Sequence, residues 1–392
     1  MGACFFVSAF FNFRVAQAGF SRRPILPATL EWVRLVDEAG SKRSMRKSGL
    51  FFLGIAAIAL SLVIWGPSIP QFIASMNPAA SIELPQETVP TSLDLTVDAE
   101  QLLNHVYALD QPRYSAEQKA TARQYITDQL ASYGITTIDQ PYGSEATGST
   151  LEGANLVAEI SGSDAAAGSI VLGAHYDTIS NSVGADDNGS AIAVLLEAAR
   201  IFSAGQSRAT LQLVFFDQEE QQADGSGLLG STAYARSANA SDVRGAVILD
   251  MVGYACREPG CQSYPSRLPI QNLPSTGDFL AVLGLSTHTE LIGAFVLSAQ
   301  KHWPLVLSLP IPEQAINFFP DLLRSDHAPF WEKNIPAVFV TDTANFRNPN
   351  YHTPQDTAET LDPDFFAGSA QHIVNAVATL LNQTAQSPAQ SS

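Results

Sequence analysis

Three short apolar runs in this chain each end in histidine or acidic residues, and this pattern restricts the fold more than any other feature. The runs cover residues 169–174, 211–216 and 245–249, and they lead directly into His175, Asp217 and Asp250. Runs of this length and apolarity are typical of buried strands. Open α/β sheets bind ligands just past the carboxyl ends of their strands, so these polar residues are expected to lie at one edge of a sheet. The sequence therefore predicts an α/β fold.

Two adjacent carboxylates, Glu219 and Glu220, follow the second run. Two acids at the end of a buried strand are unfavourable unless a cation is held there or a raised pKa is needed. Metal-assisted hydrolysis needs both, because one carboxylate binds the metal and another accepts a proton from the attacking water. The alternative interpretation is a solvated loop after a strand, and the pair alone does not decide between them.

Other segments offer ligands of the same kind. His175 is followed two residues later by Asp177, whose carboxylate can orient the ring nitrogen that is not used for a metal. The acidic turn at residues 184–190 contains Asp186 and Asp187 and leads into a helix expected over residues 191–202. Helix capping explains one such polar residue but not two successive aspartates. His352 lies in a loop bracketed by prolines, which restrict the backbone.

The spacing of the candidates indicates a site assembled by the fold. His175, Asp187, Glu220, Asp250 and His352 are separated by 12, 33, 30 and 102 residues, so no two share a helical turn. Nitrogen and oxygen ligands without cysteine suit zinc, with manganese or cobalt as substitutes. Two histidines and three carboxylates exceed the needs of one catalytic zinc. They suit two ions about 3.5–4 Å apart that share one carboxylate.

Six blocks of the sequence resemble the motifs of the di-zinc aminopeptidases. They are Gly173–Asp177, Gly184–Ser190, Phe216–Glu220, Asp250–Gly253, Ser325–Phe330 and Phe346–Thr357. That family includes secreted bacterial leucyl aminopeptidases, with glutamate carboxypeptidases, the transferrin receptor and glutaminyl cyclase as relatives. The resemblance runs from about Leu93 to Leu381 in the family's order. It implies a three-layer αβα sandwich with a central mixed, mostly parallel sheet, and a metallo-aminopeptidase with two Zn²⁺ ions per chain.

The resemblance also implies a role for each candidate ligand. His175 and Asp250 would hold one zinc, Glu220 and His352 the other, and Asp187 would bridge them. Asp186 is the competing choice for the bridge. The family often has a cis peptide bond after the bridging aspartate, which here would join Asp187 to Asn188.

The remaining roles concern the reaction and the substrate. Glu219 would be the general base and Asp177 the partner of His175. Tyr254, Tyr351 and Arg347 are candidates for the substrate site, although each could equally pack or cap a loop. The expected substrates are peptides with a free N-terminus. His327, in the Ser325–Phe330 block, is expected to be structural.

Three other functions stay open at this point. A glutaminyl-cyclase-type acyltransferase would use the same fold with a single zinc, and a carboxypeptidase would need a basic pocket for the substrate's carboxylate. An inactive receptor domain would lack the ligands that this sequence retains. Nucleic acid is excluded as a partner by the formal net charge of −17. Oligomeric state is not predicted.

The N-terminal part of the chain predicts a membrane anchor. Residues 49–66 contain no charged side chain and are long enough to cross most of a bilayer. Four basic residues lie at positions 42–47, which places the N-terminus in the cytoplasm and the catalytic domain outside it. The alternative is a signal peptide that is cleaved, giving a secreted protein. Residues 1–48 would form a cytoplasmic leader, unless translation begins at Met45.

The rest of the chain divides into three parts. Residues 67–92 are expected to be a linker, residues 93–382 the zinc aminopeptidase domain, and residues 383–392 a disordered tail. Cys256 and Cys261 lie five residues apart in a loop containing proline and glycine. In an exported domain a disulfide between them is expected. It would stiffen a loop at the rim of the active site, just after Asp250.

Overall fold

The computed structural model describes residues 92–266, 270, 272–299 and 303–383. The leader, the expected membrane segment, nearly all of the linker and nearly all of the tail therefore lie outside the described residues. No helix in the described part of the chain has the length and apolarity needed to cross a membrane.

Eight strands form one sheet in the order β1-β2-β4-β3-β5-β8-β6-β7. They are β1 (Thr137–Tyr142), β2 (Gly153–Ile160), β3 (Ser169–His175), β4 (Thr210–Phe216), β5 (Val243–Leu249), β6 (Phe279–Leu285), β7 (Leu305–Ile311) and β8 (Ala337–Thr341). The central strands β4, β3, β5 and β8 are parallel to one another. β1 pairs antiparallel with β2, β2 with β4, and β6 with β8, whereas β6 and β7 are parallel. The predicted α/β fold with a mixed sheet is confirmed.

The helices connect these strands and pack on the sheet. They are α5 (Ala99–Leu109), α6 (Ala116–Ser132), α7 (Ser144–Thr147), α8 (Ala191–Ser203), α9 (Leu229–Ala235), α10 (Thr289–Ser298), α11 (Ala328–Glu332) and α12 (Pro363–Leu381). Short 3₁₀ helices cover Ala165–Ala167, Ala238–Ala240, Glu313–Asn317 (η4), Pro320–Leu323 (η5), Ala344–Phe346 and Ala358–Thr360. A π-helical turn, η2 (Ala185–Ser190), precedes α8.

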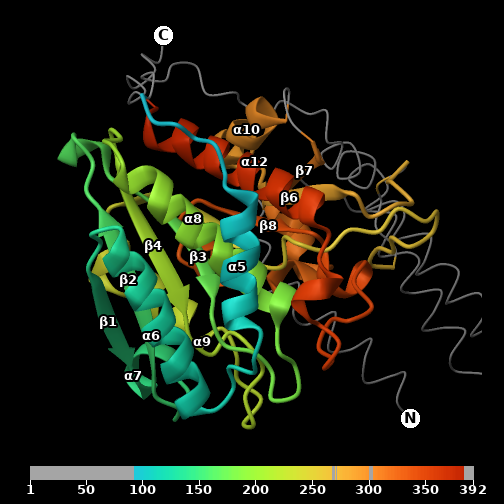
Figure 1. Cartoon of the computed structure of the whole chain (residues 1–392), viewed down its shortest axis with the longest axis horizontal. Helices are drawn as coiled ribbons and strands as arrows, with labels where there is room; N and C mark the ends of the chain where they lie inside the picture. The colour runs from blue at the N-terminus through green and yellow to red at the C-terminus, as the bar shows by residue number, and fades with distance from the viewer. Residues whose placement is uncertain (1–91, 267–269, 271, 300–302, 384–392) are drawn as a thin grey trace, which may run out of the picture. The chain divides into compact units, whose positions relative to one another are not determined.

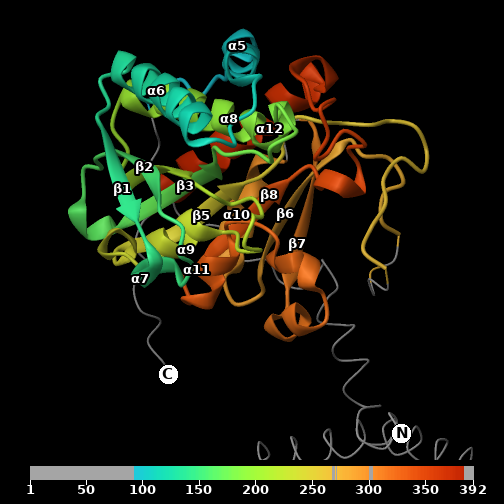
Figure 2. The ribbon, with the colours of Figure 1, turned by 90° about the horizontal axis from the view of Figure 1, so that it is seen from below.

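The two faces of the sheet bury different sets of residues because side chains alternate along a strand. In β4, Leu211, Leu213 and Phe215 join the larger core with α5, α6, α8, α10 and α12. Val214 and Phe216 point the other way and pack with Tyr234 of α9 and Phe330 of α11. Helices therefore cover both faces, with α5, α6, α8 and α12 on one side and α9 and α11 on the other (Figures 1 and 2).

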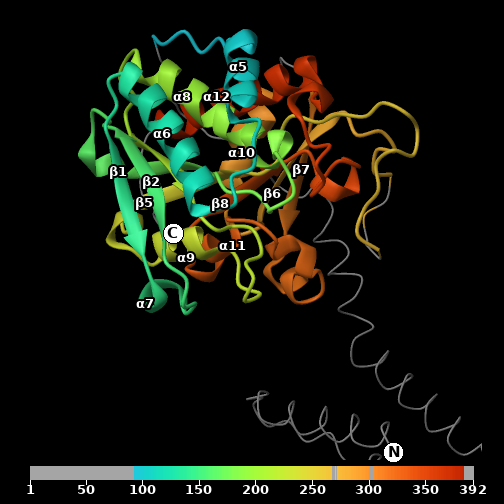
Figure 3. The same ribbon diagram turned by 60° about the horizontal axis from the view of Figure 1, so that its bottom comes forward.

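Two helices that flank the sheet begin at residues that favour helix starts. Ser115 caps α6, and it forms a reciprocal capping box with Gln118. Asp362 caps α12 through the amide of Phe365, and Pro363 occupies the first turn, where its missing N–H costs no hydrogen bond. α12 then packs against α10 and α5 (Figure 3) and against β3. α12 therefore helps to cover the face of the sheet opposite to the one covered by α9 and α11.

Candidate active site

The parallel strands deliver three of the candidate ligands to one edge of the sheet. His175 is the last residue of β3, Glu220 lies four residues after β4 ends, and Asp250 directly follows β5. Asp187 lies in η2, between β3 and α8, and His352 lies in the loop that follows β8. The carboxyl ends of β3, β4, β5 and β8 meet at this edge, where ligand sites of open α/β sheets form.

One group of donor atoms surrounds His175. Its Nε2 atom lies 3.4 Å from Oδ1 of Asp187 and 3.7 Å from Oδ1 of Asp250. The side chain of His175 is buried, and Nε2 has no hydrogen-bond partner among the described residues. A buried ring nitrogen that faces two carboxylates without a hydrogen bond suits a cation between them.

A second group surrounds His352 and uses the other oxygen of Asp187. Nε2 of His352 lies 3.2 Å from Oδ2 of Asp187 and 3.1 Å from Oε2 of Glu220. In each group the donor atoms all lie within 4.8 Å of one another. Asp187 is the residue that both groups share, and a carboxylate that offers one oxygen to each group is suited to bridging two ions.

Asp186 is engaged elsewhere. Its Oδ1 accepts a hydrogen bond of 3.0 Å from the amide of Gly253, and its Oδ2 accepts one of 2.9 Å from Nδ2 of Asn348. It belongs to neither donor group. The geometry therefore favours Asp187 over Asp186 as the shared ligand. The peptide bond between Asp187 and Asn188 is cis, as the resemblance implied.

The electrostatics of the site also favour bound cations. Burial and the nearby carboxylate of Asp187 raise the pKa of Glu220 to about 7. Burial alone would lower the pKa of His352, but Asp187 and Glu220 outweigh it and raise that pKa to about 10. Oε1 of Glu220 is buried without a hydrogen-bond partner in the described part of the chain. Carboxylates crowded in this way need compensating positive charge, and the nitrogen and oxygen donor set suits zinc.

Asp177 holds the segment after β4 in place. Its Oδ1 accepts a hydrogen bond of 3.1 Å from the amide of Glu219, and its Oδ2 accepts one of 3.3 Å from the amide of Glu220. The main-chain oxygen of Asp177 lies 3.2 Å from Nδ1 of His175, whereas its Oδ1 is 3.7 Å from that atom. The nearest partner of Nδ1 is thus the carbonyl rather than the predicted carboxylate. The carboxylate faces Nδ1 at the longer distance and also positions Glu219 and Glu220.

Three loop residues at the site have a left-handed backbone. Gln218, Met251 and His352 have φ values of 56°, 56° and 57°. Residues other than glycine adopt this region at a cost in energy, and such residues cluster at functional sites. Each lies beside or within the predicted ligand set. Tertiary contacts therefore hold these loops in conformations that the sequence alone would not favour.

A cavity of about 600 Å³ opens at the two donor groups. Asp187, Glu219, Glu220, Asp250 and His352 lie in its wall, together with Tyr351 and Arg324. Its apolar side is formed by residues on one face of β6, β7 and β8 and by neighbouring segments, namely Tyr264, Ile270, Leu273, Phe279, Ala281, Leu283, Leu307, Leu309, Ile311, Phe319, Leu322, Leu323, Phe339 and Phe346. Leu283 and Phe339 are only half-buried although they lie in inner strands. This part of the sheet is therefore open to a ligand.

Two of the three residues suggested for the substrate site do not line this cavity. Arg347 is buried, and its guanidinium donates to Oε1 of Gln262 and to the main-chain oxygens of Tyr254 and Phe279. The structure thus supports the packing alternative for Arg347. Tyr254 also lies outside the cavity wall, whereas Tyr351 lies within it and stacks on His352.

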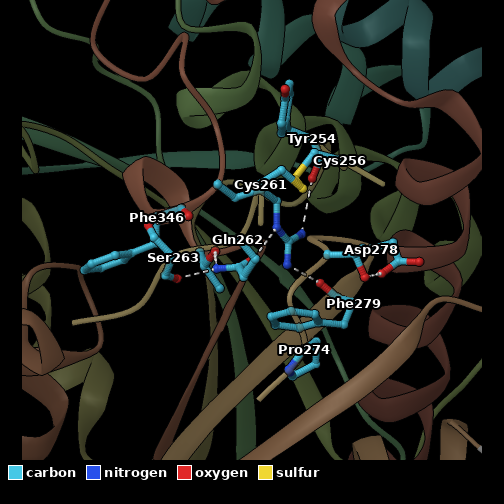
Figure 4. Close-up of a disulfide and its surroundings, with 12 residues drawn as sticks. Tyr254, Cys256, Cys261, Gln262, Ser263, Pro274, Asp278, Phe279 and Phe346 are labelled. Atoms are coloured by element: carbon cyan, nitrogen blue, oxygen red, sulfur yellow. Dashed lines mark hydrogen bonds between the residues drawn. A yellow bond between two sulfur atoms is a disulfide. The ribbon is translucent and has the colours of Figure 1, made fainter. Parts of the chain in front are cut away.

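The disulfide between Cys256 and Cys261 is present (Figure 4), and the chain that follows it reaches the cavity wall. The chain continues from Cys261 to Ser263, whose amide and hydroxyl both donate to the main-chain oxygen of Phe346. Ser263 and Phe346 are in the cavity wall. The bond therefore closes a loop that is tied directly to the substrate side of the site.

His327 does not belong to either donor group. It is buried, its Nε2 lies 2.8 Å from the main-chain oxygen of Leu322, and its ring stacks on Phe339. Burial lowers the pKa of His327 to about 4, so the ring is neutral at physiological pH. The structural role expected from the sequence fits these contacts.

Arg324 was a candidate from the sequence for a basic pocket, whereas two other charged residues at the site, Arg113 and Asp356, were not predicted. Arg324 lies in the cavity wall and donates to Oδ1 of Asn345 and the hydroxyl of Tyr351. Arg113 and Asp356 are buried beside the ligand loops. Asp356 stands four residues after His352, and that proximity was the one available signal. Arg113 lies 62 residues before His175, between two helices, and nothing in its neighbourhood marks it.

Comparison with known proteins identifies the family. Residues 155–377 match the model of "Peptidase family M28", which is more than half of the chain. The chain belongs to peptidase family M28. This membership supports a hydrolase, and the metal ligands proposed above all lie within the matched residues.

Several known proteins are similar to this chain. The M28 chain is 34% identical over 271 residues to the uncharacterized protein YfbL of Escherichia coli strain K12, covering 66% of this chain and 78% of that protein. It is 24% identical to a probable leucine aminopeptidase of Trichophyton verrucosum, covering 86% of this chain and 85% of the relative. The structure of a glutaminyl cyclase from Porphyromonas gingivalis superposes with a TM-score of 0.54 at 22% identity, over 72% of this chain and 98% of the cyclase, which shows a shared fold.

Proposed function

We propose that this protein is a di-zinc aminopeptidase that removes apolar N-terminal residues from peptides. The observation that carries the proposal is the pair of donor groups that share Asp187 in the wall of a largely apolar cavity. His175 and Asp250 would hold one ion, Glu220 and His352 the other, and Asp187 both. Two zinc ions bound there would lower the pKa of a water molecule towards neutrality and polarise the scissile carbonyl.

Glu219 is the residue proposed to move the proton. It lies in the cavity wall but in neither donor group, which favours a role other than that of a metal ligand. The hydrogen bond from its amide to Asp177 fixes its main chain relative to His175. Glu219 would accept a proton from the attacking water and pass it to the leaving amine.

The charge of the cavity supports recognition of a free amino group. Five carboxylates line it: Asp187, Glu219, Glu220, Asp250 and Asp321. The two ions would neutralise Asp187, Glu220 and Asp250, so Glu219 and Asp321 are the acidic groups left to face a substrate. Arg324 is the one lysine or arginine among the described residues of the wall. A carboxypeptidase needs a basic pocket for the terminal carboxylate. Arg324 and Arg347 are the basic residues close to the motifs, and Arg347 is packed inside the protein. An ammonium group is the better match for this wall.

The apolar side of the cavity supports apolar N-terminal residues as substrates. Two rows of side chains cross the sheet here, Thr341-Ala281-Leu307 and Phe339-Leu283-Leu309, because these residues are paired in register. A leucyl or phenylalanyl side chain placed over these rows would lose most of its contact with water, which is favourable by about 1.5–3 kcal/mol. Charged side chains would find no partner among the residues of these two rows.

The disulfide supports an oxidising location for the domain. Cys256 and Cys261 are bonded, and such bonds persist in secreted and periplasmic proteins but are rare in the cytosol. We therefore keep the proposal that the catalytic domain acts outside the cytoplasm. It would be held by the apolar segment at residues 49–66, or released if that segment is cleaved.

A substrate panel tests the proposal. The full chain with zinc should hydrolyse a leucyl amide, lose that activity with a chelator, and leave the N-acetylated leucyl amide intact. Cleavage of N-acyl dipeptides with a free carboxylate would instead show a carboxypeptidase. Release of ammonia from an N-terminal glutamine without peptide cleavage would show a glutaminyl cyclase, which the second donor group argues against.

A further inference from the structure

Arg113 connects the chain just after His175 with the chain just before Asp187. It lies between α5 and α6 and is fully buried. Nε donates to the main-chain oxygen of Tyr176 at 2.8 Å, and Nη2 donates to that of Gly184 at 2.8 Å. Tyr176 follows His175, and Gly184 stands three residues before Asp187. One planar guanidinium therefore holds both ends of the segment that separates the two ligands.

The other donors of Arg113 fasten it to its own loop and to the same segment. Nη1 donates to the main-chain oxygens of Leu109 at 2.6 Å, Gln111 at 3.2 Å and Val183 at 2.8 Å. Space beside the guanidinium is limited, because a Cβ atom on Gly184 would lie 2.9 Å from Nη2. Gly184 also has a φ of 63°, so glycine suits this position twice over.

Asp356, in the loop that carries His352, binds the backbone of the acidic turn. Its Oδ1 accepts a hydrogen bond of 3.0 Å from the amide of Asp186, and its Oδ2 accepts one of 3.1 Å from the amide of Asp187. Its main-chain oxygen accepts from the amide of Ala185 at 3.0 Å. Asp356 is fully buried. The backbone of the shared ligand is thus fixed directly to the loop that carries His352.

Charge links the two residues to the metal ligands. Burial lowers the pKa of Arg113 to about 10, while Asp356, Asp187 and Asp177 favour its charged form. Arg113 therefore stays protonated at neutral pH. Its hydrogen bonds go to carbonyl oxygens rather than to carboxylates, so its charge offsets the buried acids while its fork fixes the main chain.

We propose that Arg113 and Asp356 act as a pair of positioning residues for the metal centre, holding residues 176–187 so that His175 and Asp187 reach the same ion. The inference rests on the zinc centre of the proposed function. Outer residues that fix ligands typically contribute 10–100-fold to metal affinity. A purely structural role would lower the stability of the fold and leave the affinity for zinc unchanged.

Zinc titration against a competing chromophoric chelator tests the pair in the full chain, with no need for substrate. Arg113→Lys should weaken zinc binding by roughly 10–100-fold. It keeps the positive charge, but an ammonium group cannot reproduce the planar fork that contacts Tyr176 and Gly184 together. Arg244→Lys is the control, because Arg244 donates to the main-chain oxygen of Leu380 and stands at the opposite end of β5 from Asp250. It should leave zinc affinity unchanged.

Asp356→Asn provides a second test that does not depend on Arg113. The asparagine retains one acceptor oxygen and turns an NH₂ group towards the amide of Asp186 or Asp187. The affinity of both zinc sites should fall, because Asp187 is a proposed ligand at each of them. Thermal unfolding in the presence of chelator, monitored by circular dichroism, measures the loss of stability of each variant without bound zinc. Each variant is then titrated with zinc at a temperature at which it is folded.

The outcomes separate the pair from the proposed function. Wild-type zinc affinity in a folded Arg113→Lys or Asp356→Asn variant would overturn the positioning role and leave the aminopeptidase proposal intact. If Arg113→Lys does not fold, the affinity of Asp356→Asn decides. Absence of zinc binding by the wild-type chain would overturn both proposals.

Discussion

Replacing Glu219 by glutamine is the sharpest perturbation that this structure allows. Glutamine has nearly the same shape as glutamate but cannot accept the proton of the attacking water. The main-chain amide of residue 219 would keep its 3.1 Å hydrogen bond to Asp177. The glutamine side chain should therefore leave the backbone at the same position as the glutamate side chain. Glu219 belongs to neither donor group, and both groups should therefore keep their ions.

The expected size of the effect follows from these contacts. Losing a positioned general base slows a reaction by roughly 10²–10⁴-fold, which corresponds to about 2.7–5.4 kcal/mol in the barrier. Because ligands and cavity walls are unchanged, the loss should fall on kcat while KM changes little. Glu258→Gln removes the same charge from an exposed position in the disulfide loop and should behave as wild type.

The assay combines steady-state kinetics on a leucyl amide with measurement of bound zinc. The expected variant holds two ions per chain and turns over at less than a hundredth of the wild-type rate, taking the lower end of the range above. Near wild-type turnover would refute the role given to Glu219. Loss of zinc together with activity would show instead that Glu219 is a ligand.

Three further predictions concern the ions, the rim and the apolar wall. Asp187→Ala should remove both ions and His352→Ala only one, because Asp187 is the residue that belongs to both donor groups. Measuring the metal bound per chain tests this, and equal losses in the two variants would contradict a shared ligand. Replacing Cys256 and Cys261 by serine should lower the free energy of unfolding by about 2 kcal/mol for so short a loop, as measured by denaturant titration. The same change should raise KM more than it alters kcat. An unchanged KM would show that the disulfide does not support the cavity wall. Ala281→Leu, which adds bulk over the sheet rows, should reduce kcat/KM for leucyl relative to alanyl substrates by roughly tenfold or more, as expected for methylene groups in an apolar pocket. An equal fall for both substrates would place the leucyl side chain elsewhere.

The outline of the site was available from the sequence because it depends on local order. Apolar runs lead into His175, Glu219-Glu220 and Asp250. Each run predicts a strand, and its direction predicts the edge of the sheet at which the polar residue lies. Parallel strands bring these ends together whatever the intervening loops do. The fold class and the ligand candidates are therefore consequences of short segments, each a few residues long.

Other features depended on contacts between distant segments. Asp186 and Asp187 are neighbours of the same type, and only the hydrogen bonds from Gly253 and Asn348 show that Asp186 is already used. Arg347 stands beside a ligand motif in the sequence yet packs inside the protein. Arg113 lies far from any motif yet donates to the chain on both sides of the acidic turn.

The sequence by itself determined which residues can bind metal and at which end of the sheet they stand, because strand direction and residue type are properties of single segments. Only the tertiary structure decided which oxygen each ligand presents, which arginine faces the cavity, and that the wall beside the ions is apolar. Those properties arise where β6, β7 and β8 meet loops from elsewhere in the chain, and distances between such segments are set by packing rather than by local order.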